Sequence, residues 1–339
     1  KHIRQSNKMK KSIISRLSNL VSKLPLGDKL VIIANVLVHD WRINPPVTGF
    51  LFEKEKYSKI QTVYHDLDSK SQRILQRFLW RELYLPNTLQ DARYFFYNYS
   101  RIFSKEERKE QKSLYAQLHK VQNKYHLAEN EGGPESLGYH HGLDKMPQQV
   151  LNYIQGKDFI DAGACYGDST LVFSQYHPRK IYAFEPSPIN QQHFLELMKK
   201  THVPEEIYEL VPCGLDSKAG TLFFSDKGDG GNDLKKSGET KADLITLDNF
   251  TEKNQLNVGL IKADLEGMGL EMLKGAHETI LKYRPVLSLS IYHNQEEFFG
   301  TYPLLKEWKL NYHFHVRALS FPFNIAEITL IGVPEELLK

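Results

Sequence analysis

The 339-residue sequence has few cysteines and no long apolar stretch. Its two cysteines, Cys165 and Cys213, lie in unrelated contexts without metal-ligand spacing. This excludes a disulfide scaffold and a cysteine metal site, and it favours a reducing compartment. No run approaches the roughly 18 uninterrupted apolar residues that a membrane span needs. No secretory signal peptide is visible either, so we expect a cytoplasmic protein.

The sequence also lacks a strong excess of one charge. Lys and Arg number 44 against 41 Asp and Glu, and the formal net charge of +3 gives no argument for a nucleic-acid partner. Hydrophobic residues make up 41% and charged residues 25%, which is typical of a soluble globular protein. The length predicts about two domains.

Residues 1–130 are predicted to form a mainly α-helical N-terminal region. Seven basic residues and no acidic one precede Asp28, and apolar residues recur there at helical spacing. Such a helix packs on its own domain or, as the alternative, lies on an anionic membrane surface at the inner face. The aromatic run 93–99 favours a core or subunit contact, so a homodimer is one expectation. A polar Gly/Pro segment, 129–136, predicts the boundary to a second domain, 131–339.

In the second domain, short apolar runs alternate with helical patterns, which predicts an open, mostly parallel α/β sheet. We expect strands around residues 159–160, 181–184, 208–211, 260–263 and 286–291. Two runs near the C-terminus, 312–319 and 325–333, predict a terminal antiparallel hairpin. Ser187-Pro188 begins one helix, and residues 270–283 form another, which Arg284-Pro285 ends.

A glycine-rich turn with an acidic residue follows the first predicted strand. Asp161 stands at the strand end, and Gly163 and Gly167 allow the backbone to approach a ligand closely. An acid here suits a cationic or amine-bearing ligand. The spacing is Asp-x-Gly-x-x-x-Gly and not the Gly-x-Gly-x-x-Gly of a nicotinamide-binding fold.

A second acid, Glu185, ends the next predicted strand, 24 residues after Asp161. A carboxylate at this position can accept both ribose hydroxyls of an adenosine. Together the two turns indicate a ligand with an adenosyl group and a cationic, amino-acid-like tail. That ligand is S-adenosylmethionine.

At this point the sequence resembles the FkbM-type methyltransferases, over about residues 139–332. The resemblance implies the class I methyltransferase fold, a Rossmann-like, mostly parallel α/β sheet, with S-adenosylmethionine as cofactor and S-adenosylhomocysteine as product. The family pattern usually carries an acid where this sequence has Gly269. The motifs are Ile160-Asp161-Ala162-Gly163-Ala164 with Gly167-Asp168-Ser169, Ala183-Phe184-Glu185-Pro186-Ser187, Thr246-Leu247-Asp248-Asn249-Phe250, Ile261-Lys262-Ala263-Asp264-Leu265-Glu266-Gly267 and Ser290-Ile291-Tyr292-His293.

The resemblance also implies the residues that hold the cofactor. The turn at Asp161 would line the methionine moiety, Glu185 would bind the ribose, and Cys213-Gly214 would pass the adenine ring. Two alternatives stay open: Asp168 and Ser169 cap the following helix, and Cys213 is a buried core residue. The full set is Asp161, Gly163, Ala164, Gly167, Asp168, Ser169, Glu185, Pro186, Ser187, Cys213, Gly214 and Asp264.

The candidate catalytic residues are Asp264, Glu266 and His293. Strand alternation predicts that both carboxylates lie on one face, where they orient the substrate or a base. Holding a divalent cation with oxygen ligands is the less favoured alternative, and we expect no metal. His293 follows a strand that ends at the same edge, as a general base for a hydroxyl acceptor or as a substrate hydrogen-bonding residue.

Further substrate-binding candidates are His140, His141 and Asn232. The two histidines precede the first strand of the second domain and could close over the cofactor, or else belong to a solvated loop. Asn232 lies in a polar, glycine-rich loop that lacks the Lys-Ser/Thr ending of a P-loop.

We therefore expect an S-adenosylmethionine-dependent O-methyltransferase. The resemblance points to a sugar hydroxyl in a surface polysaccharide, glycolipid or secondary metabolite, presented as a nucleotide-linked or lipid-linked acceptor. One alternative is a non-catalytic, cofactor-binding scaffold module of a glycan synthase. An NAD-dependent oxidoreductase and a nucleic-acid methyltransferase are less favoured, because their motifs are missing.

Overall fold

The computed structural model describes residues 54–84, 105–127, 131–226, 238–319 and 327–339. The basic segment near the N-terminus, the aromatic run 93–99 and Asn232 lie outside the described residues. The membrane-surface and homodimer expectations that rest on those segments stay predictions. No helix in the described ranges has both the length and the apolar character needed to cross a membrane.

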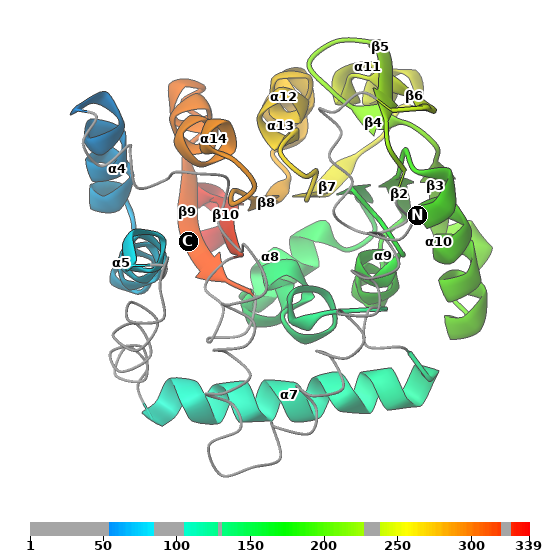
Figure 1. Ribbon diagram of the computed structural model, residues 1–339, viewed down its shortest axis with the longest axis horizontal. Helices are drawn as coiled ribbons and strands as arrows, with labels where there is room; N and C mark the ends of the chain where they lie inside the picture. The colour runs from blue at the N-terminus through cyan, green and yellow to red at the C-terminus, as the bar shows by residue number, and fades with distance from the viewer. Residues whose placement is uncertain (1–53, 85–104, 128–130, 227–237, 320–326) are drawn as a thin grey trace, which may run out of the picture.

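A seven-stranded sheet with the order β3-β2-β1-β7-β8-β10-β9 forms the centre of the molecule (Figure 1). Five of its strands are parallel, and β10 pairs antiparallel with both β8 and β9. This confirms the predicted strands and the terminal hairpin. The strands are β1 (Asp158–Ala162), β2 (Lys180–Phe184), β3 (Tyr208–Val211), β7 (Val258–Ala263), β8 (Val286–Ser290), β9 (Tyr312–Ala318) and β10 (Ile328–Pro334).

Helices cover both faces of the sheet, which explains why every residue of β1 and β7 is buried (Figure 1). One face is covered by α8 (Gln148–Ile154), α9 (Asp168–Phe173) and α10 (Pro188–Thr201). The other face is covered by α11 (Leu247–Lys253), α12 (Gly269–Lys274), α13 (His277–Tyr283) and α14 (Gln295–Glu307). A small sheet of β4 (Gly214–Leu215), β6 (Thr240–Ile245) and β5 (Gly220–Phe224) completes the domain. Short turns of helix are η1 (Pro134–Gly138), η2 (His140–Lys145), η3 (Ser174–Tyr176), η4 (Glu205–Ile207) and η5 (Glu335–Leu338).

Residues 269–283 form two helices, where the sequence predicted one. The chain breaks after α12 at Gly275, whose Cα lies so close to the backbone that an added Cβ would stand 2.2 Å from the Asp216 carbonyl oxygen. The close approach of these two backbones ends the first helix. Ser187 caps α10 as predicted, accepting a hydrogen bond from the Asn190 amide with Pro188 in the first helical position.

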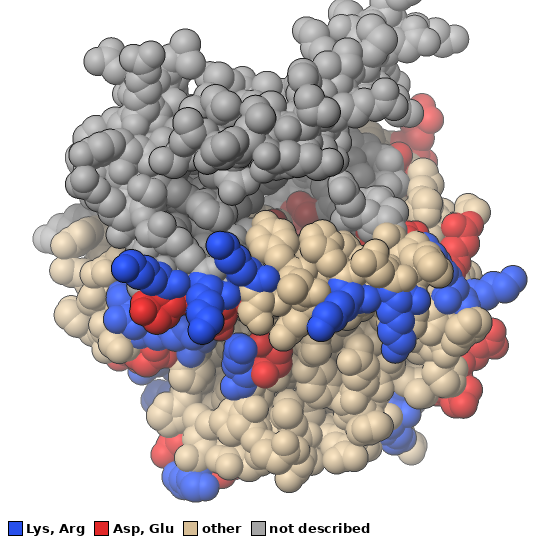
Figure 2. Space-filling model, turned by 90° about the horizontal axis from the view of Figure 1, so that it is seen from below, with Lys and Arg blue, Asp and Glu red and all other residues tan. Residues whose placement is uncertain are grey.

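Three helices of the N-terminal region are described, and they agree with its predicted helical character. Of these, α5 (Ser69–Tyr84) lies beside the edge strand β9, and α4 (Lys54–Asp66) lies beside α14 (Figure 1). The hydroxyl of Ser71 accepts a hydrogen bond from the Val316 amide, so α5 satisfies part of this open sheet edge. The third, α7 (Lys105–Tyr125), buries Leu114 and Leu118 and turns its lysines outward, where basic side chains form a row (Figure 2).

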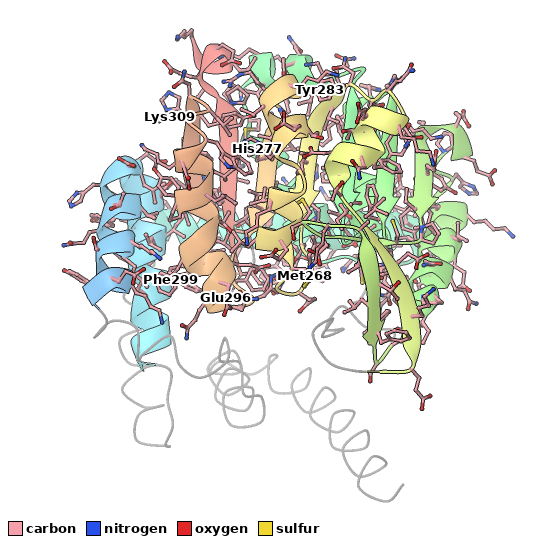
Figure 3. The ribbon with its side chains drawn as sticks, turned by 90° about the horizontal axis from the view of Figure 1, so that it is seen from above. Met268, His277, Tyr283, Glu296, Phe299 and Lys309 are labelled. Atoms are coloured by element: carbon pink, nitrogen blue, oxygen red, sulfur yellow. The ribbon has the colours of Figure 1, made fainter. Side chains whose placement is uncertain are left out.

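The strand order reverses between β1 and β7, and the loops that follow these two strands therefore meet at the carboxyl edge of the sheet. Figure 3 shows Met268 and Glu296 near this edge, and Tyr283 and Lys309 near the opposite one. The candidate site is described at the carboxyl edge.

Candidate active site

A buried ion pair lies at the base of the site. The strand register places Asp161 of β1 beside Lys262 of β7, and Lys262 Nζ is 3.1 Å from Asp161 Oδ1. Ser169 and Thr170 donate hydrogen bonds to Asp161 Oδ2 at 2.6 and 2.7 Å. Burial disfavours the charge of Lys262, but Asp161 and Asp264 outweigh it and raise the pKa of the ammonium. The sequence predicted that Asp161 lines the ligand, whereas its fully buried carboxylate contacts the protein and organises the turn.

Lys262 also links the two loops that follow β1 and β7. Lys262 Nζ donates a 2.6 Å hydrogen bond to the Gly163 carbonyl oxygen. Gly163 has a φ of +78°, and an added Cβ would stand 1.9 Å from the Asp264 carbonyl oxygen. Gly163 and Ala164 both donate their amides to the Phe184 carbonyl at 3.0 Å. A residue with a side chain cannot occupy position 163 without moving the second loop.

The capping role considered for Asp168 and Ser169 is not found. The N-cap of α9 is Gly167, in the left-handed conformation with φ of +89°. Ser169 donates to Asp161 instead, and Asp168 accepts a short hydrogen bond from the Ser136 hydroxyl of η1. Burial raises the pKa of Asp168. These two side chains therefore contact neighbouring elements, and the N-cap position of α9 is occupied by Gly167.

Glu185 lies immediately after β2, with its carboxylate held in a fixed orientation. Its oxygens accept hydrogen bonds from the Cys165 and Ser187 amides, both at 2.9 Å, and from Asn190 Nδ2 at 3.4 Å. Burial raises the pKa of this carboxyl, although these hydrogen bonds favour its charged form. The arrangement places a carboxylate beside the glycine turn, one strand away from Asp161.

A small apolar cavity adjoins Glu185. Three residues of the predicted cofactor-binding set, Pro186, Cys213 and Gly214, line it. Cys213 is a free, buried cysteine, so the core-residue interpretation describes it equally well. The other lining residues are Phe184, Leu215, Leu222, Leu244, Leu265 and Met268.

Beyond β7 and β8, His293 lies between two carboxylates. Its Nε2 is 2.9 Å from Asp264 Oδ1, and its Nδ1 is 2.9 Å from Glu297 Oε2. Glu266 Oε1 lies farther away, 3.9 Å from Nε2. Burial disfavours the imidazolium, but the two close carboxylates outweigh it and raise the pKa of His293 well above its usual value. Burial likewise opposes the charge of Asp264, but its contact with His293 lowers the pKa of that carboxyl.

The three predicted catalytic residues, Asp264, Glu266 and His293, therefore lie close together. The two acids are not brought together by strand alternation, because they lie in the loop after the strand. β7 ends at Ala263, and Glu266 has a left-handed backbone with φ of +47°. A non-glycine residue in this conformation stores strain, a feature that clusters at functional sites.

Glu297 also contacts Gly269, the position where the family pattern usually carries an acid. Its Oε1 accepts a 2.8 Å hydrogen bond from the Gly269 amide, and an added Cβ at Gly269 would stand 2.9 Å from the same oxygen. The carboxylate of α14 thus occupies the space that a side chain at position 269 would need.

The two neighbouring histidines have different surroundings. His141 is buried, its Nε2 has no hydrogen-bond partner, and burial together with the nearby Lys262 lowers its pKa to about 3. A neutral ring with an unpartnered polar atom is therefore held beside the ion pair. His140 points elsewhere, with its Nδ1 2.6 Å from the Tyr176 hydroxyl beyond the far end of α9.

The comparisons with known proteins agree with this geometry. A family model described as the methyltransferase FkbM domain matches residues 161–321. Residues 161–321 therefore correspond to an FkbM methyltransferase domain. The match covers the glycine turn, Glu185, both acids after β7 and His293.

A solved structure of an FkbM methyltransferase shows the same fold. Methyltransferase FkbM from Methylobacillus flagellatus KT is 17% identical, with a TM-score of 0.55 over 87% of this chain and 61% of that one. This chain thus spans about 61% of the length of that protein. An rRNA methylase from Streptococcus thermophilus is 12% identical, with a TM-score of 0.39 over 59% of this chain and 96% of that one. Aeropyrum pernix fibrillarin with bound S-adenosylmethionine is 15% identical, with a TM-score of 0.36 over 57% and 71%. The last two likenesses are too weak to carry an argument. No curated protein matches the sequence.

Several site residues of the FkbM domain were missed by sequence reasoning. Lys262 stood in a quoted motif without a role, and a lysine on an otherwise apolar strand is a signal that could have identified it. Glu297 follows His293 by four residues, but nothing local distinguishes it from Glu296. Glu135 belongs to the segment predicted as a linker, yet burial and the nearby Glu327 and Asp168 raise the pKa of its carboxyl well above the usual value.

Within the described ranges, no group of three or more His, Cys, Asp or Glu side chains is arranged to hold a metal ion.

Proposed function

We propose that this protein is an S-adenosylmethionine-dependent O-methyltransferase that acts on a hydroxyl of a sugar, in a surface polysaccharide, a glycolipid or a secondary metabolite. The observation that supports it most is the pairing of Glu185 with the glycine turn at the switch point, inside an FkbM domain. S-adenosylmethionine would supply an electrophilic methyl group. The acceptor class rests on the family resemblance.

The residues at this edge fit that cofactor. Glu185 would accept the ribose hydroxyls, and the apolar residues Pro186, Cys213 and Gly214 beside it would contact an adenine ring. The unpartnered His141 Nε2 offers a polar contact at the base of the site. The carboxylates of Asp264 and Glu266 lie at this edge and would favour the positive charge of the cofactor's tail. The protein would accelerate the transfer mainly by holding the acceptor oxygen in position.

Calorimetry with S-adenosylmethionine, S-adenosylhomocysteine and NAD tests the cofactor. We expect binding of both adenosyl ligands by the wild type and a loss of about tenfold or more in Glu185→Ala, because the ribose would lose charge-assisted hydrogen bonds. The matched control is Glu209→Ala on the neighbouring strand, whose carboxylate pairs with Lys180 at the surface. Binding of NAD alone, or of no ligand, would refute the proposal.

A screen of nucleotide-linked and lipid-linked sugars, read by the mass of an added methyl group, tests the acceptor. A methylated sugar supports O-methylation. Cofactor binding without turnover on the whole panel would favour the scaffold interpretation.

A further inference from the structure

We propose that Glu297 is a positioning residue that, together with Asp264, holds His293 as a doubly protonated imidazolium, so that His293 acts as a fixed hydrogen-bond donor and not as the proton acceptor. The catalytic consequence rests on the proposed function. The protonation state of His293 does not, because it follows from contacts within the protein.

Both ring nitrogens of His293 face carboxylate oxygens at 2.9 Å, from Glu297 on one side and Asp264 on the other. An ionised carboxylate only accepts hydrogen bonds, so each contact is favourable when the facing nitrogen carries a proton. His293 is 6% exposed and Glu297 is 1% exposed, and water therefore replaces neither contact. Nδ1 meets Glu297 with hydrogen-bond geometry. Nε2 and Asp264 Oδ1 pair by charge without hydrogen-bond alignment and have no other hydrogen-bond partner among the described residues, so the charge of Asp264 favours a proton on Nε2.

The carboxylate of Glu297 is held at both of its oxygens. Its second oxygen accepts the Gly269 amide at 2.8 Å, so both oxygens have donors. Glu297 is the third residue of α14, where the helix dipole favours negative charge. Asn294 caps this helix through the Glu297 amide and donates Nδ2 to the Gly267 carbonyl at 2.9 Å, which ties the helix start to the loop after β7.

Three carboxylates lie around the ring of His293: Asp264 and Glu266 from the loop after β7 and Glu297 from α14. Further charged and titratable groups act on its neighbours Asp264 and Tyr292: Lys262 from β7, His141 from η2, Glu135 from η1 and Glu327 before β10.

The consequence for catalysis concerns Glu266. Its side chain is 39% exposed at the mouth of the site, 3.9 Å from the imidazolium. With His293 already protonated, a carboxylate at this edge has to receive the proton of an acceptor hydroxyl, and Glu266 is the more exposed of the two carboxylates after β7.

Nuclear magnetic resonance of the ¹⁵N-histidine-labelled full chain tests the inference without cofactor or acceptor. The His293 signals are assigned by their loss in His293→Gln. We expect both ring nitrogens to stay protonated from pH 5 to beyond pH 8 in the wild type. In Glu297→Gln the proton affinity should fall by about tenfold or more, because one opposite charge is removed. Glu296→Gln is the control, since this neighbour on α14 is exposed, and it should match the wild type.

A wild-type His293 that titrates near pH 6.5, or an unchanged titration in folded Glu297→Gln, would overturn the inference. Circular dichroism reports whether the variant folds. If it does not fold, the wild-type titration and the charge-conserving Glu297→Asp decide the question. A failed search for methyl transfer would refute the proposed function and leave this result standing.

Discussion

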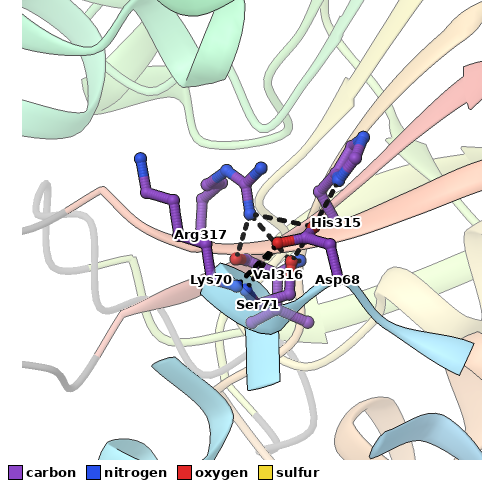
Figure 4. Close-up of polar contacts among 6 residues, drawn as sticks. All are labelled: Asp68, Lys70, Ser71, His315, Val316 and Arg317. Carbon is purple, nitrogen blue, oxygen red and sulfur yellow. Dashed lines mark hydrogen bonds and ion pairs between the residues drawn. The ribbon is translucent and has the colours of Figure 1, made fainter. Parts of the chain in front are cut away.

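His293 and His315 both lie beside a carboxylate at the start of a helix, but at different places in the fold. Glu297 belongs to the first turn of α14 at the carboxyl edge. Asp68 precedes α5, accepts the Lys70 and Ser71 amides at 2.9 and 3.0 Å, and lies 2.6 Å from His315 Nδ1 on the edge strand β9 (Figure 4). The local chemistry of the two pairs is therefore similar.

Their surroundings differ. His293 is nearly enclosed and meets a second carboxylate, whereas the side chains of His315 and Asp68 are 28% and 38% exposed. Asp68 also lies 3.7 Å from Arg317 Nη1, and the whole group joins α5 to the sheet (Figure 4). The comparison teaches that a histidine–carboxylate pair is not by itself a site. Burial and a position beyond the ends of parallel strands distinguish the pair at the candidate site from the pair that fastens a helix.

The largest effect should come from the buried ion pair at the base of the site. In Lys262→Met the carboxylate of Asp161 loses its cation in a dry environment, and we expect a loss of about 3–5 kcal/mol of unfolding free energy. Urea denaturation measures it. The control is Lys306→Met, which removes an exposed pair with Asp66 and should cost no more than about 1 kcal/mol. Equal losses in the two variants would contradict the contrast between enclosed and exposed charges.

The group around His293 should give an intermediate, pH-dependent effect. His293→Gln leaves two carboxylates without their cation, and we expect a loss of about 2–4 kcal/mol near pH 5–6, since Asp264 is partly exposed. The pKa of Asp264 is lowered on folding, so its contribution is present above about pH 4 and is lost as the pH falls. The pKa of His293 is raised, so its contribution is complete below about pH 6.5 and is lost as the pH rises through the folded value.

Chemical denaturation from pH 3 to 9 measures this effect. The difference in unfolding free energy between wild type and His293→Gln should be largest between about pH 4 and 6.5. A gap independent of pH would mean that packing, and not charge, accounts for the loss.

The smallest effect should come from Asp68. Asp68→Ala removes a helix cap and an exposed ionic contact, for an expected loss of about 1–2 kcal/mol at neutral pH. Hydrogen bonds from Ser71 and His315 outweigh partial burial and lower the pKa of Asp68, so the difference from wild type should shrink as the pH falls below about 4. Thermal unfolding measures this loss. Unchanged cofactor binding in Asp68→Ala would show that the Asp68–His315 pair joins α5 to the sheet and takes no part in the candidate site.

Much of the fold could be predicted because its signals are local. The apolar runs gave β1, β2, β3, β7 and β8 in order, and Ser187-Pro188 marked the start of α10. The break between α12 and α13 could not be predicted, because it depends on a backbone more than fifty residues away at Asp216.

The amino-acid sequence alone determined which acids follow which strands, and therefore that Asp161, Glu185, Asp264 and His293 share one edge of the sheet. Parallel strands end at the same edge whatever packs around them. Only the tertiary structure decided what each side chain contacts there: Asp161 is closed off by Lys262, and His293 is held by Glu297. Those assignments depend on burial and on contacts between distant segments, which exclude water and fix the groups that each charge meets, and no local pattern in the sequence records them.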